Sequence, residues 1–223
     1  MEDKKKIYDD IYANPKYKGL AYHQLEAVYK NALLGIYDDS LIPRDSVKLK
    51  FAYSPKDAVE YSIKYAYDYN PNYPHYAGYG GDCANFISQA LYAGGKPMIG
   101  YRSDSMKDWF CRTKNKWDTN LISSTWRGAS AFKTYWSNNA NGYRDFGSSY
   151  FESIEAFREV YNYGNRGDVV TLYTAEGKPY HTLIIVDYDK GDLICASHSY
   201  DSSGRSLLVA DPEGGARIYR MSI

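Results

Sequence analysis

The chain has 223 residues, which is enough for one domain with a substantial core. Its 27 Lys and Arg residues balance its 27 Asp and Glu residues, so it lacks the basic excess that is typical of nucleic-acid-binding proteins. No apolar run approaches the roughly 20 residues that span a bilayer. We therefore expect no nucleic-acid partner and no membrane span.

Cysteine content and the first residues bear on cofactors and compartment. The three cysteines, Cys83, Cys111 and Cys195, are too few and too scattered for a disulfide framework or a zinc site. We expect neither a metal nor a cofactor. The polar residues 1–6 are not followed by the apolar segment of a signal peptide. We expect a cytoplasmic protein, or one from the cell envelope or exterior whose leader was removed.

Residues 1–50 are predicted to form an N-terminal helical extension. Asn14-Pro15 interrupts this segment, which favours two helices over one. Apolar side chains recur at helical spacing through Tyr22, Leu25, Val28, Tyr29, Ala32 and Leu33. The extension carries no catalytic signature, and residues 51–223 are predicted to form the main domain.

A further helix is predicted from the sequence Ser54-Pro55-Lys56-Asp57. Ser54 is a favoured N-cap residue, proline suits the first helical position, and an acid suits the first turn. The pattern continues to about Tyr69, where Asn70-Pro71 ends it. A loop rich in glycine then leads to Gly80.

The most informative stretch is Gly80-Gly81-Asp82-Cys83-Ala84-Asn85-Phe86-Ile87-Ser88-Gln89. The glycine pair permits a tight turn, Asp82 is an N-cap residue type, and apolar residues then follow at helical spacing as far as Gly94-Gly95. A helix is therefore predicted to begin at Cys83. The positive end of a helix dipole lowers the pKa of a thiol there. The alternative is that Cys83 is a small buried hydrophobe, so a nucleophilic role needs a base elsewhere in the chain.

Residues 96–147 are predicted to form an aromatic-rich insert. Ser103 or Asp104 can cap a short helix through Trp109 and Phe110 that includes Cys111, and a second helix is predicted over 129–136. The insert is either a specificity element or a covering layer that fills the core. The two alternatives assign different roles, recognition or core packing, to the tryptophans Trp109, Trp117, Trp126 and Trp136.

The last third of the chain changes from helical to strand periodicity. Ser148 or Ser149 is predicted to cap a helix. Runs rich in β-branched residues then predict strands over 169–173, 180–188 and 193–198, and a last strand near 216–221. Helices followed by an antiparallel meander indicate the α+β class.

Two histidines fall on neighbouring predicted strands. His181 lies near the start of one strand and His198 near the end of the next, and these ends are side by side in an antiparallel hairpin. Thiol chemistry needs one histidine to exchange the proton and a second polar group to hold its ring. Cys83, His181 and His198 fit this need by type. The alternative is a solvent-facing strand end for His181 and a turn-capping role for His198.

The stretch from Gly80 to Gln89, with Leu91-Tyr92-Ala93-Gly94-Gly95, resembles the signature of the putative amidase domain family. That family belongs to the papain-like NlpC/P60 and CHAP group of cysteine hydrolases. Later segments resemble the other motifs of that group in the same order, over about residues 54–205: Gly167-Asp168-Val169-Val170, His181-Thr182-Leu183-Ile184-Ile185, and Ser197-His198-Ser199 with Asp201.

The resemblance implies a papain-like NlpC/P60-type fold, in which N-terminal helices, with the catalytic cysteine at a helix N-terminus, pack on an antiparallel β-sheet. Cys83 would be the nucleophile, His181 the general base and acid, and His198 the residue that orients His181. Asp201 and Asp82 are supporting candidates. The family usually has threonine where this chain has Ala84, and the backbone amide of Cys83 would stabilise the oxyanion.

These features predict a cysteine amidase or peptidase that cleaves an amide bond through a thioester intermediate. The expected substrate is a peptidoglycan stem peptide or another peptide. One alternative is a catalytically inactive papain-like module that binds cell-wall or peptide ligands, and another is acyl transfer with the same nucleophile. The sequence leaves the oligomeric state open.

Overall fold

The structure is a computed structural model that describes residues 53–79, 81–199 and 201–222, with short pieces among the first 32 residues (6–7, 10–11, 14–17, 28–29 and 31–32). The predicted extension over 1–50 lies largely outside the described residues. Its described part includes a 3₁₀-helix, η1 (Pro15–Tyr17), and a small buried cluster. No helix in the described ranges is both long and apolar enough to cross a membrane.

A six-stranded antiparallel sheet forms the centre of the molecule, in the order β1-β6-β2-β3-β4-β5. Its strands are β1 (Gly142–Phe146), β2 (Val169–Tyr173), β3 (Pro179–Asp189), β4 (Asp192–Ser197), β5 (Ser202–Ser206) and β6 (Ala216–Arg220). The sheet and the helices around it confirm the predicted α+β class.

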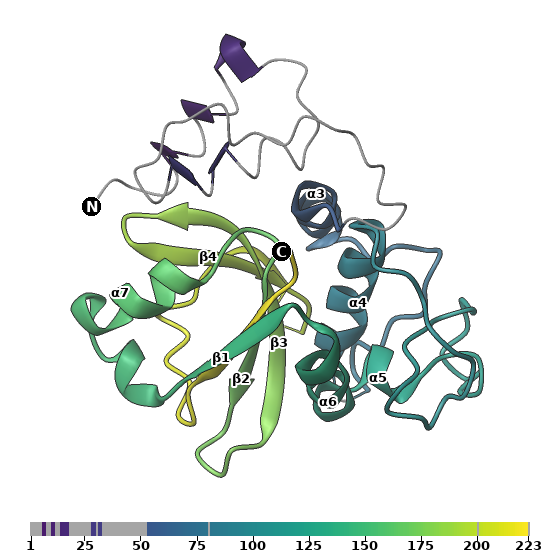
Figure 1. Ribbon diagram of the computed structural model, residues 1–223. Coiled ribbons are helices and arrows are strands. Elements are labelled where there is room, and N and C mark those ends of the chain that lie inside the picture. The colour runs from purple at the N-terminus through teal and green to yellow at the C-terminus, as the bar shows by residue number, and fades with distance from the viewer. Residues whose placement is uncertain are drawn as a thin grey trace.

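Helices cover the sheet in two groups (Figure 1). The first group comprises α3 (Pro55–Tyr65), α4 (Cys83–Ala93), α5 (Ser124–Arg127) and α6 (Ala129–Asn139). The second comprises η3 (Ser148–Phe151) and α7 (Ile154–Tyr163), which lie on the opposite side.

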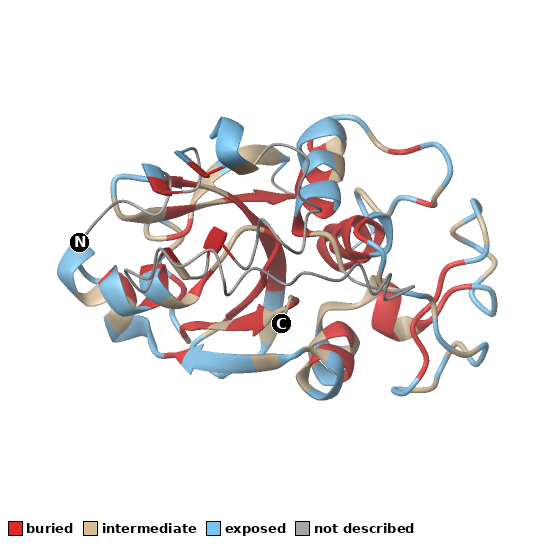
Figure 2. Cartoon of the chain, turned by 45° about the horizontal axis from the view of Figure 1, so that its top comes forward, coloured by how far each residue is buried: buried red, intermediate tan, exposed pale blue. Residues whose placement is uncertain are grey.

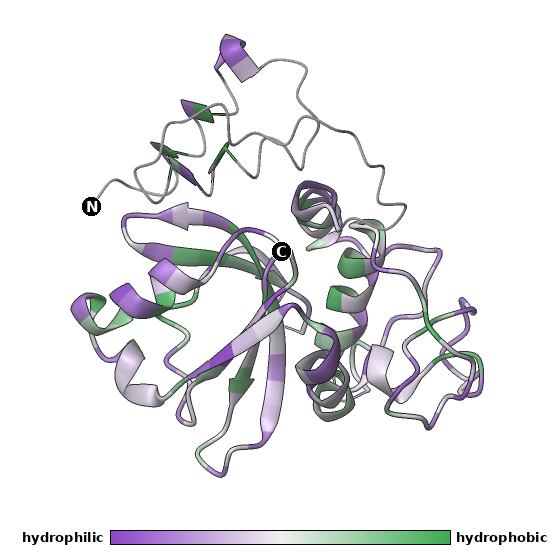
Figure 3. Ribbon diagram, in the orientation of Figure 1, coloured by the Kyte–Doolittle hydropathy of each residue, from purple (hydrophilic) through white to green (hydrophobic). Residues whose placement is uncertain are grey.

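Alternation along β3 produces two hydrophobic cores. Ile184 and Val186 pack in the cluster that contains α4, whereas Leu183 and Ile185 pack in the cluster that contains α7. Figure 2 shows buried residues along the central strands and the inner sides of the helices. Figure 3 shows that α4 and the central strands are also rich in hydrophobic residues. Strand β3 is therefore the element that both layers share.

Several predicted elements are confirmed at their starts. Helix α3 begins at Pro55, and the Ser54 hydroxyl accepts from the Asp57 amide at 3.2 Å. Helix α4 begins at Cys83 and ends before Gly94 and Gly95, as predicted. The predicted strands over 169–173, 180–188 and 193–198 correspond to β2, β3 and β4.

Helix α3 ends at Tyr65, one turn before the predicted end at Tyr69. The carbonyl of Tyr65 would accept the amide of Tyr69 if the helix continued. Instead it lies 2.6 Å from Nε2 of His198, which comes from the far end of the chain. A tertiary contact therefore ends this helix.

The predicted helix through Trp109 and Phe110 is wrong. Trp109 pairs with Ile99 and Cys111 pairs with Ile122 in isolated antiparallel bridges. The Asp108 carboxylate holds the loop between Ile99 and Trp109. It accepts hydrogen bonds from Tyr101 N, Arg102 N and Ser105 Oγ at 2.8 Å each.

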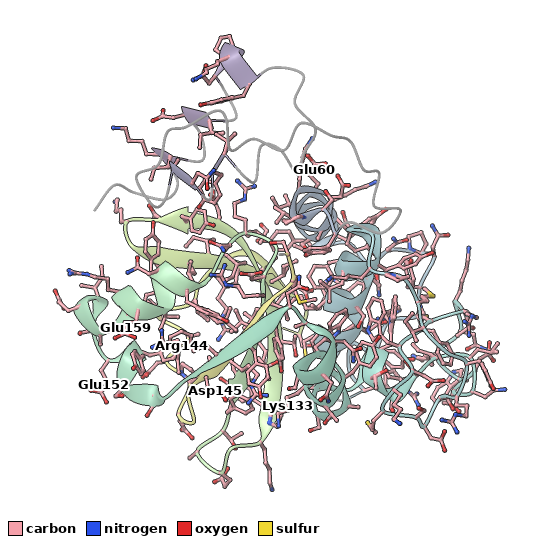
Figure 4. All side chains as sticks on the ribbon, in the orientation of Figure 1. Glu60, Lys133, Arg144, Asp145, Glu152 and Glu159 are labelled. Atoms are coloured by element: carbon pink, nitrogen blue, oxygen red, sulfur yellow. The ribbon has the colours of Figure 1, made fainter. Side chains whose placement is uncertain are left out.

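The cap predicted at Ser148 or Ser149 is also wrong, because these residues begin η3 and Ser153 caps α7. Strands β1 and β5 were not predicted. Most β1 residues are exposed and polar, so no apolar pattern marks the strand. Ion pairs join it to its neighbours: Arg144 pairs with Glu159 of α7 (Figure 4), and Asp145 pairs with Arg217 of β6 at 2.6 Å.

We expect Gly167→Ala to destabilise the junction between α3 and β2. Gly167 has φ +83°, and an added Cβ would lie 2.5 Å from Cβ of Pro55. Left-handed strain and overpacking together should lower the free energy of unfolding by roughly 2–4 kcal/mol. Gly177→Ala is the matched control, because Gly177 has φ +74° and open space around it. Urea denaturation measures both, and equal losses would contradict the steric explanation.

Candidate active site

Cys83 is the first residue of α4, and its sulfur lies against the edge of β3. The side chain is 7% exposed. The backbone amides of Thr182 and of Ala84 in the first helical turn lie near the sulfur and favour its thiolate form. Because Thr182 directly follows His181, the thiol lies beside the backbone of the predicted base.

The hydrogen-bonding pattern of β3 explains why the Thr182 amide faces the sulfur. The amide of Ile185 donates to Asp168 on the β2 side at 2.9 Å. N–H groups along a strand alternate between its two neighbours, so the amide of Thr182 points to the β4 side. Strand β4 ends at Ser197, before it reaches this amide. This amide therefore lies beyond the last residue of β4 and near the Cys83 sulfur.

His181 is buried in β3 and lies opposite Leu172 of β2. Burial lowers the pKa of His181 to about 4, and the charge of Arg205 acts in the same direction. Its imidazole is therefore neutral at pH 7 and able to accept a proton. The His181 side chain leaves the strand on the face that Leu172 and Leu183 share, which α7 covers, whereas Cys83 belongs to α4 on the other face.

The pKa of Cys83 differs from the expectation for a helix N-terminus. Burial raises the pKa of this thiol, and the neighbouring Asp82 carboxylate raises it further, against the opposing effect of the Thr182 and Ala84 amides. The expected lowering of the pKa is thus outweighed by burial. The site contains a neutral thiol and a neutral imidazole at pH 7.

Asp82 and His198 form a buried pair next to Cys83. Nδ1 of His198 lies 2.7 Å from Oδ2 of Asp82, and its Nε2 lies 2.6 Å from the carbonyl oxygen of Tyr65. Asp82 occupies the N-cap position of α4, as predicted, but its carboxylate makes no cap hydrogen bond. It accepts instead from the Tyr76 amide at 2.7 Å and from Asn85 Nδ2 at 2.9 Å.

The structure thus brings Cys83 to the segment that carries His181, and it brings His198 to Asp82. Both nitrogens of His198 are engaged, so neither is left for the imidazole of His181. Asp201 accepts from the Ser199 amide at 3.2 Å and supports the turn that carries His198.

Other polar residues of the cysteine motif hold surrounding loops. Asn85 Oδ1 accepts from Nε1 of Trp126 at 2.9 Å, and its Nδ2 donates to the Pro74 carbonyl at 2.8 Å. Gln89 Oε1 accepts from the Tyr61 hydroxyl at 2.6 Å. These residues hold the helix that begins at Cys83 to the segments around it. Sequence reasoning recognised the motif but not this role, because each partner is distant in the chain.

The structure separates the four tryptophans of the 96–147 segment. Trp109, Trp126 and Trp136 are buried, whereas Trp117 is 68% exposed. Its ring meets that of Tyr79, which is 60% exposed, edge-on at a centroid distance of 5.8 Å. Nζ of Lys116 lies 3.8 Å from the Tyr79 centroid. Tyr79 was not predicted as a site residue, yet it lies only a short loop before Cys83.

No group of three metal-ligating side chains is present among the described residues.

Comparisons with known proteins support the family resemblance. Residues 52–220 match the model of the putative amidase domain family. The chain is 30% identical to the uncharacterized protein YhbB of Bacillus subtilis (strain 168) over 171 residues, which cover 76% of this chain and 49% of YhbB. It is 31% identical to the uncharacterized protein YjcM of the same organism over 166 residues, which cover 74% and 36%. The chain thus spans about half or less of these relatives. No solved structure gives a significant match.

We expect iodoacetamide to label native Cys83 with an apparent pKa above that of an ordinary thiol. The rate should still be rising at pH 9, because burial and the Asp82 charge oppose thiolate formation. Mass spectrometry resolves the three cysteines, and after unfolding in urea all should titrate near ~8.5. A native rate that is already constant by pH 7 would instead indicate a preformed thiolate.

Proposed function

The chain belongs to the putative amidase domain family, and from this premise we propose that it is a hydrolase that cleaves an amide bond with Cys83 as nucleophile. One observation carries the proposal. The thiol lies at the N-terminus of α4, and the backbone amide of Thr182, the residue next to His181, is near enough to favour its thiolate. The nearness of the Thr182 backbone to the sulfur supports the proposal that the neighbouring His181 is the base.

In the proposed reaction, the neutral imidazole of His181 takes the thiol proton as the sulfur attacks the carbonyl carbon. A C–S bond forms, and the carbonyl electron pair moves to the oxygen. The imidazolium then protonates the amide nitrogen, the C–N bond breaks, and the amine leaves a thioester on Cys83. Water, deprotonated by His181, attacks the thioester, and cleavage of the C–S bond releases the acid and restores the thiol.

The first turn of α4 supports stabilisation of the oxyanion. The Asp82 side chain does not cap this turn, which leaves the amides of Cys83 and Ala84 available for the proposed oxyanion. Fixed N–H donors at the positive end of a helix stabilise charge that develops on a carbonyl oxygen. Gln89 does not serve this purpose, because it is bound to Tyr61.

We further propose that the fold is papain-like, of the NlpC/P60 type, with the hydrolase domain over 51–223 and a helical extension over 1–50. The placement of Cys83 at the head of a helix packed on an antiparallel sheet supports this proposal. The proposed substrate is a peptide, including the stem peptides of peptidoglycan. The exposed Tyr79 and Trp117 provide an apolar surface along which such a chain can lie.

Burial of Cys83 and the raised pKa of its thiol favour one alternative, an inactive module that binds the same ligands. The two functions differ in their response to one substitution. An enzyme loses turnover in Cys83→Ala and keeps binding, whereas a binding module has no turnover to lose.

We expect Cys83→Ala to abolish hydrolysis of a peptidoglycan digest and of a peptide library, by at least ~10³-fold. Rapid quenching of the wild type should trap an acyl group on Cys83, read by mass spectrometry. Cys111→Ala is the matched control, because Cys111 lies in a bridge outside the site. Full activity in Cys83→Ala would refute the proposed nucleophile.

The pH dependence follows from the state of His181. The base must be neutral, and because the pKa of His181 is lowered to about 4, kcat/KM should hold its value as the pH falls through 6.5 and decline only towards 4. The unfolded chain takes up this proton at higher pH than the folded chain, so stability falls over the same window and the folded fraction must be measured in parallel. An acid limb centred near 6.5 would contradict this assignment.

We expect Trp117→Ala to raise KM by about tenfold with little change in kcat, because it removes apolar contact without touching the reacting atoms. Trp117→Phe should restore much of the affinity. Steady-state kinetics on the best peptide measure both, and an unchanged KM in Trp117→Ala would remove this surface from the proposed binding site.

A further inference from the structure

We propose that His198 is a positioning residue, a buried imidazolium that holds Asp82 and thereby fixes the start of the helix on which Cys83 lies. This role differs from the one expected from the sequence, in which His198 orients His181. The inference rests on the proposed function of Cys83 as nucleophile.

The partners of His198 determine its protons. Nε2 lies 2.6 Å from the carbonyl oxygen of Tyr65, which can only accept, so Nε2 carries a hydrogen. Nδ1 lies 2.7 Å from Oδ2 of Asp82, and a second proton must lie between these two atoms. The pair therefore holds two protons, one on Nε2 and one shared with the carboxyl group.

The surroundings of Asp82 place the shared proton on the ring. Oδ1 of Asp82 accepts from the Tyr76 amide and from Asn85 Nδ2, at 2.7 and 2.9 Å. Hydrogen bonds from N–H donors stabilise a carboxylate relative to a carboxylic acid. The arrangement is thus a carboxylate and an imidazolium joined by a charge-assisted hydrogen bond.

Aromatic rings enclose the imidazolium. Phe86 of α4 stacks on it at a centroid distance of 3.9 Å and an interplanar angle of 17°, and Tyr69 lies at 4.5 Å. The ring is 2% exposed. Asp82 is the carboxylate that contacts it, and Asp201 and His75 lie beyond, next to Tyr69. A cation is favoured over aromatic faces, and here it is shielded from water.

This pair joins the segments that surround the nucleophile. His198 binds the end of α3 through Tyr65 and the start of α4 through Asp82. The adjacent Ser199 Oγ accepts from the Asp82 amide at 2.6 Å, so the backbone and the side chain of Asp82 are held by the same turn. The next residue along the chain is Cys83.

The pair also sets the electrostatics of the thiol. The Asp82 carboxylate raises the pKa of Cys83, and the positive ring beside it offsets that charge. Removal of the ring alone would leave a buried carboxylate without its cation, next to the nucleophile. The thiol would then lose a proton less readily, and the first turn of α4 would lose its anchor.

The first experiment measures the protonation of His198 in the wild-type full chain. Long-range ¹H–¹⁵N NMR of protein labelled in its histidine rings should show two protonated nitrogens for His198 at pH 7.5, with its ring identified by contacts to Phe86. His75, which is exposed, serves as the internal control. An unprotonated nitrogen in the His198 ring would overturn the inference, and this readout needs no variant and no substrate.

The second experiment compares His198→Gln with the matched control His75→Gln, after circular dichroism has verified folding. In His198→Gln, iodoacetamide labelling of Cys83 should be about tenfold slower at a given pH near neutrality, and its titration should move to higher pH. Asp82→Asn in the same chain removes the uncompensated charge and should move the titration back. A mere loss of packing would not be reversed in this way, so a titration in His198→Gln that matches the wild type, or one that Asp82→Asn leaves unchanged, would overturn the inference.

On the best peptide substrate, His198→Gln should lower kcat by about 10–100-fold with a smaller change in KM, because the nucleophile is displaced and substrate contacts remain. The two proposals fail differently. A wild-type chain that cleaves no amide refutes the proposed function and leaves the NMR and labelling results standing. A His198→Gln enzyme with wild-type kcat refutes the positioning role alone.

Discussion

The hydrogen bond between Asp82 and His198 is the contact on which the arrangement of the site depends. It is formed by residues 116 positions apart, and both side chains are buried. The same histidine occupies the Tyr65 carbonyl that a longer α3 would need, so it also decides where that helix ends. The loop after α3, the start of α4 and the turn after β4 are thereby held to one buried charge pair. A pair of this kind contributes specificity of geometry more than net stability, because its desolvation offsets much of its attraction.

In that geometry, opposing effects act on the pKa of the candidate nucleophile, Cys83. A helix N-terminus and three backbone amides favour the thiolate of Cys83, whereas burial and the Asp82 charge disfavour it, and the latter prevail. His181 is likewise held neutral by burial. In the proposed reaction, a thiol and an imidazole in these states differ from a preformed ion pair, since the proton would move during attack and not before it. The energy for charge separation would then come from substrate binding and from the amides of the first turn of α4.

Local sequence patterns predicted the helices and strands that are determined by residues close together in the sequence. The glycine pair, the apolar spacing after Cys83 and the glycines at 94 and 95 determine both ends of α4, and β-branched runs mark β2, β3 and β4. The elements that were not predicted depend on tertiary contacts. Strand β1 is polar and is held by β6, and the loop before Trp109 is ordered by the carboxylate of Asp108. At the site, the sequence identified Asp82 and His198 as members of one group, but it could not show that they bind each other. The strand register and the direction of the His198 side chain depend on where β4 ends.

The same dependence on distant segments extends to the surface that a substrate would meet. Tyr79 lies on the loop that leads into α4, whereas Trp117 and Lys116 come from the segment between Cys111 and Ile122, and the three side chains pack together. Lys114 of that segment also donates to Asn72 Oδ1, at the start of the loop. The loop before Cys83 therefore contacts the segment between Cys111 and Ile122 on its outer side. On its inner side, the Tyr76 amide binds Asp82. Tyr79, which meets the outer segment, and Tyr76, which binds Asp82, thus lie three residues apart, so the proposed binding surface and the N-cap of α4 depend on the same short stretch of chain.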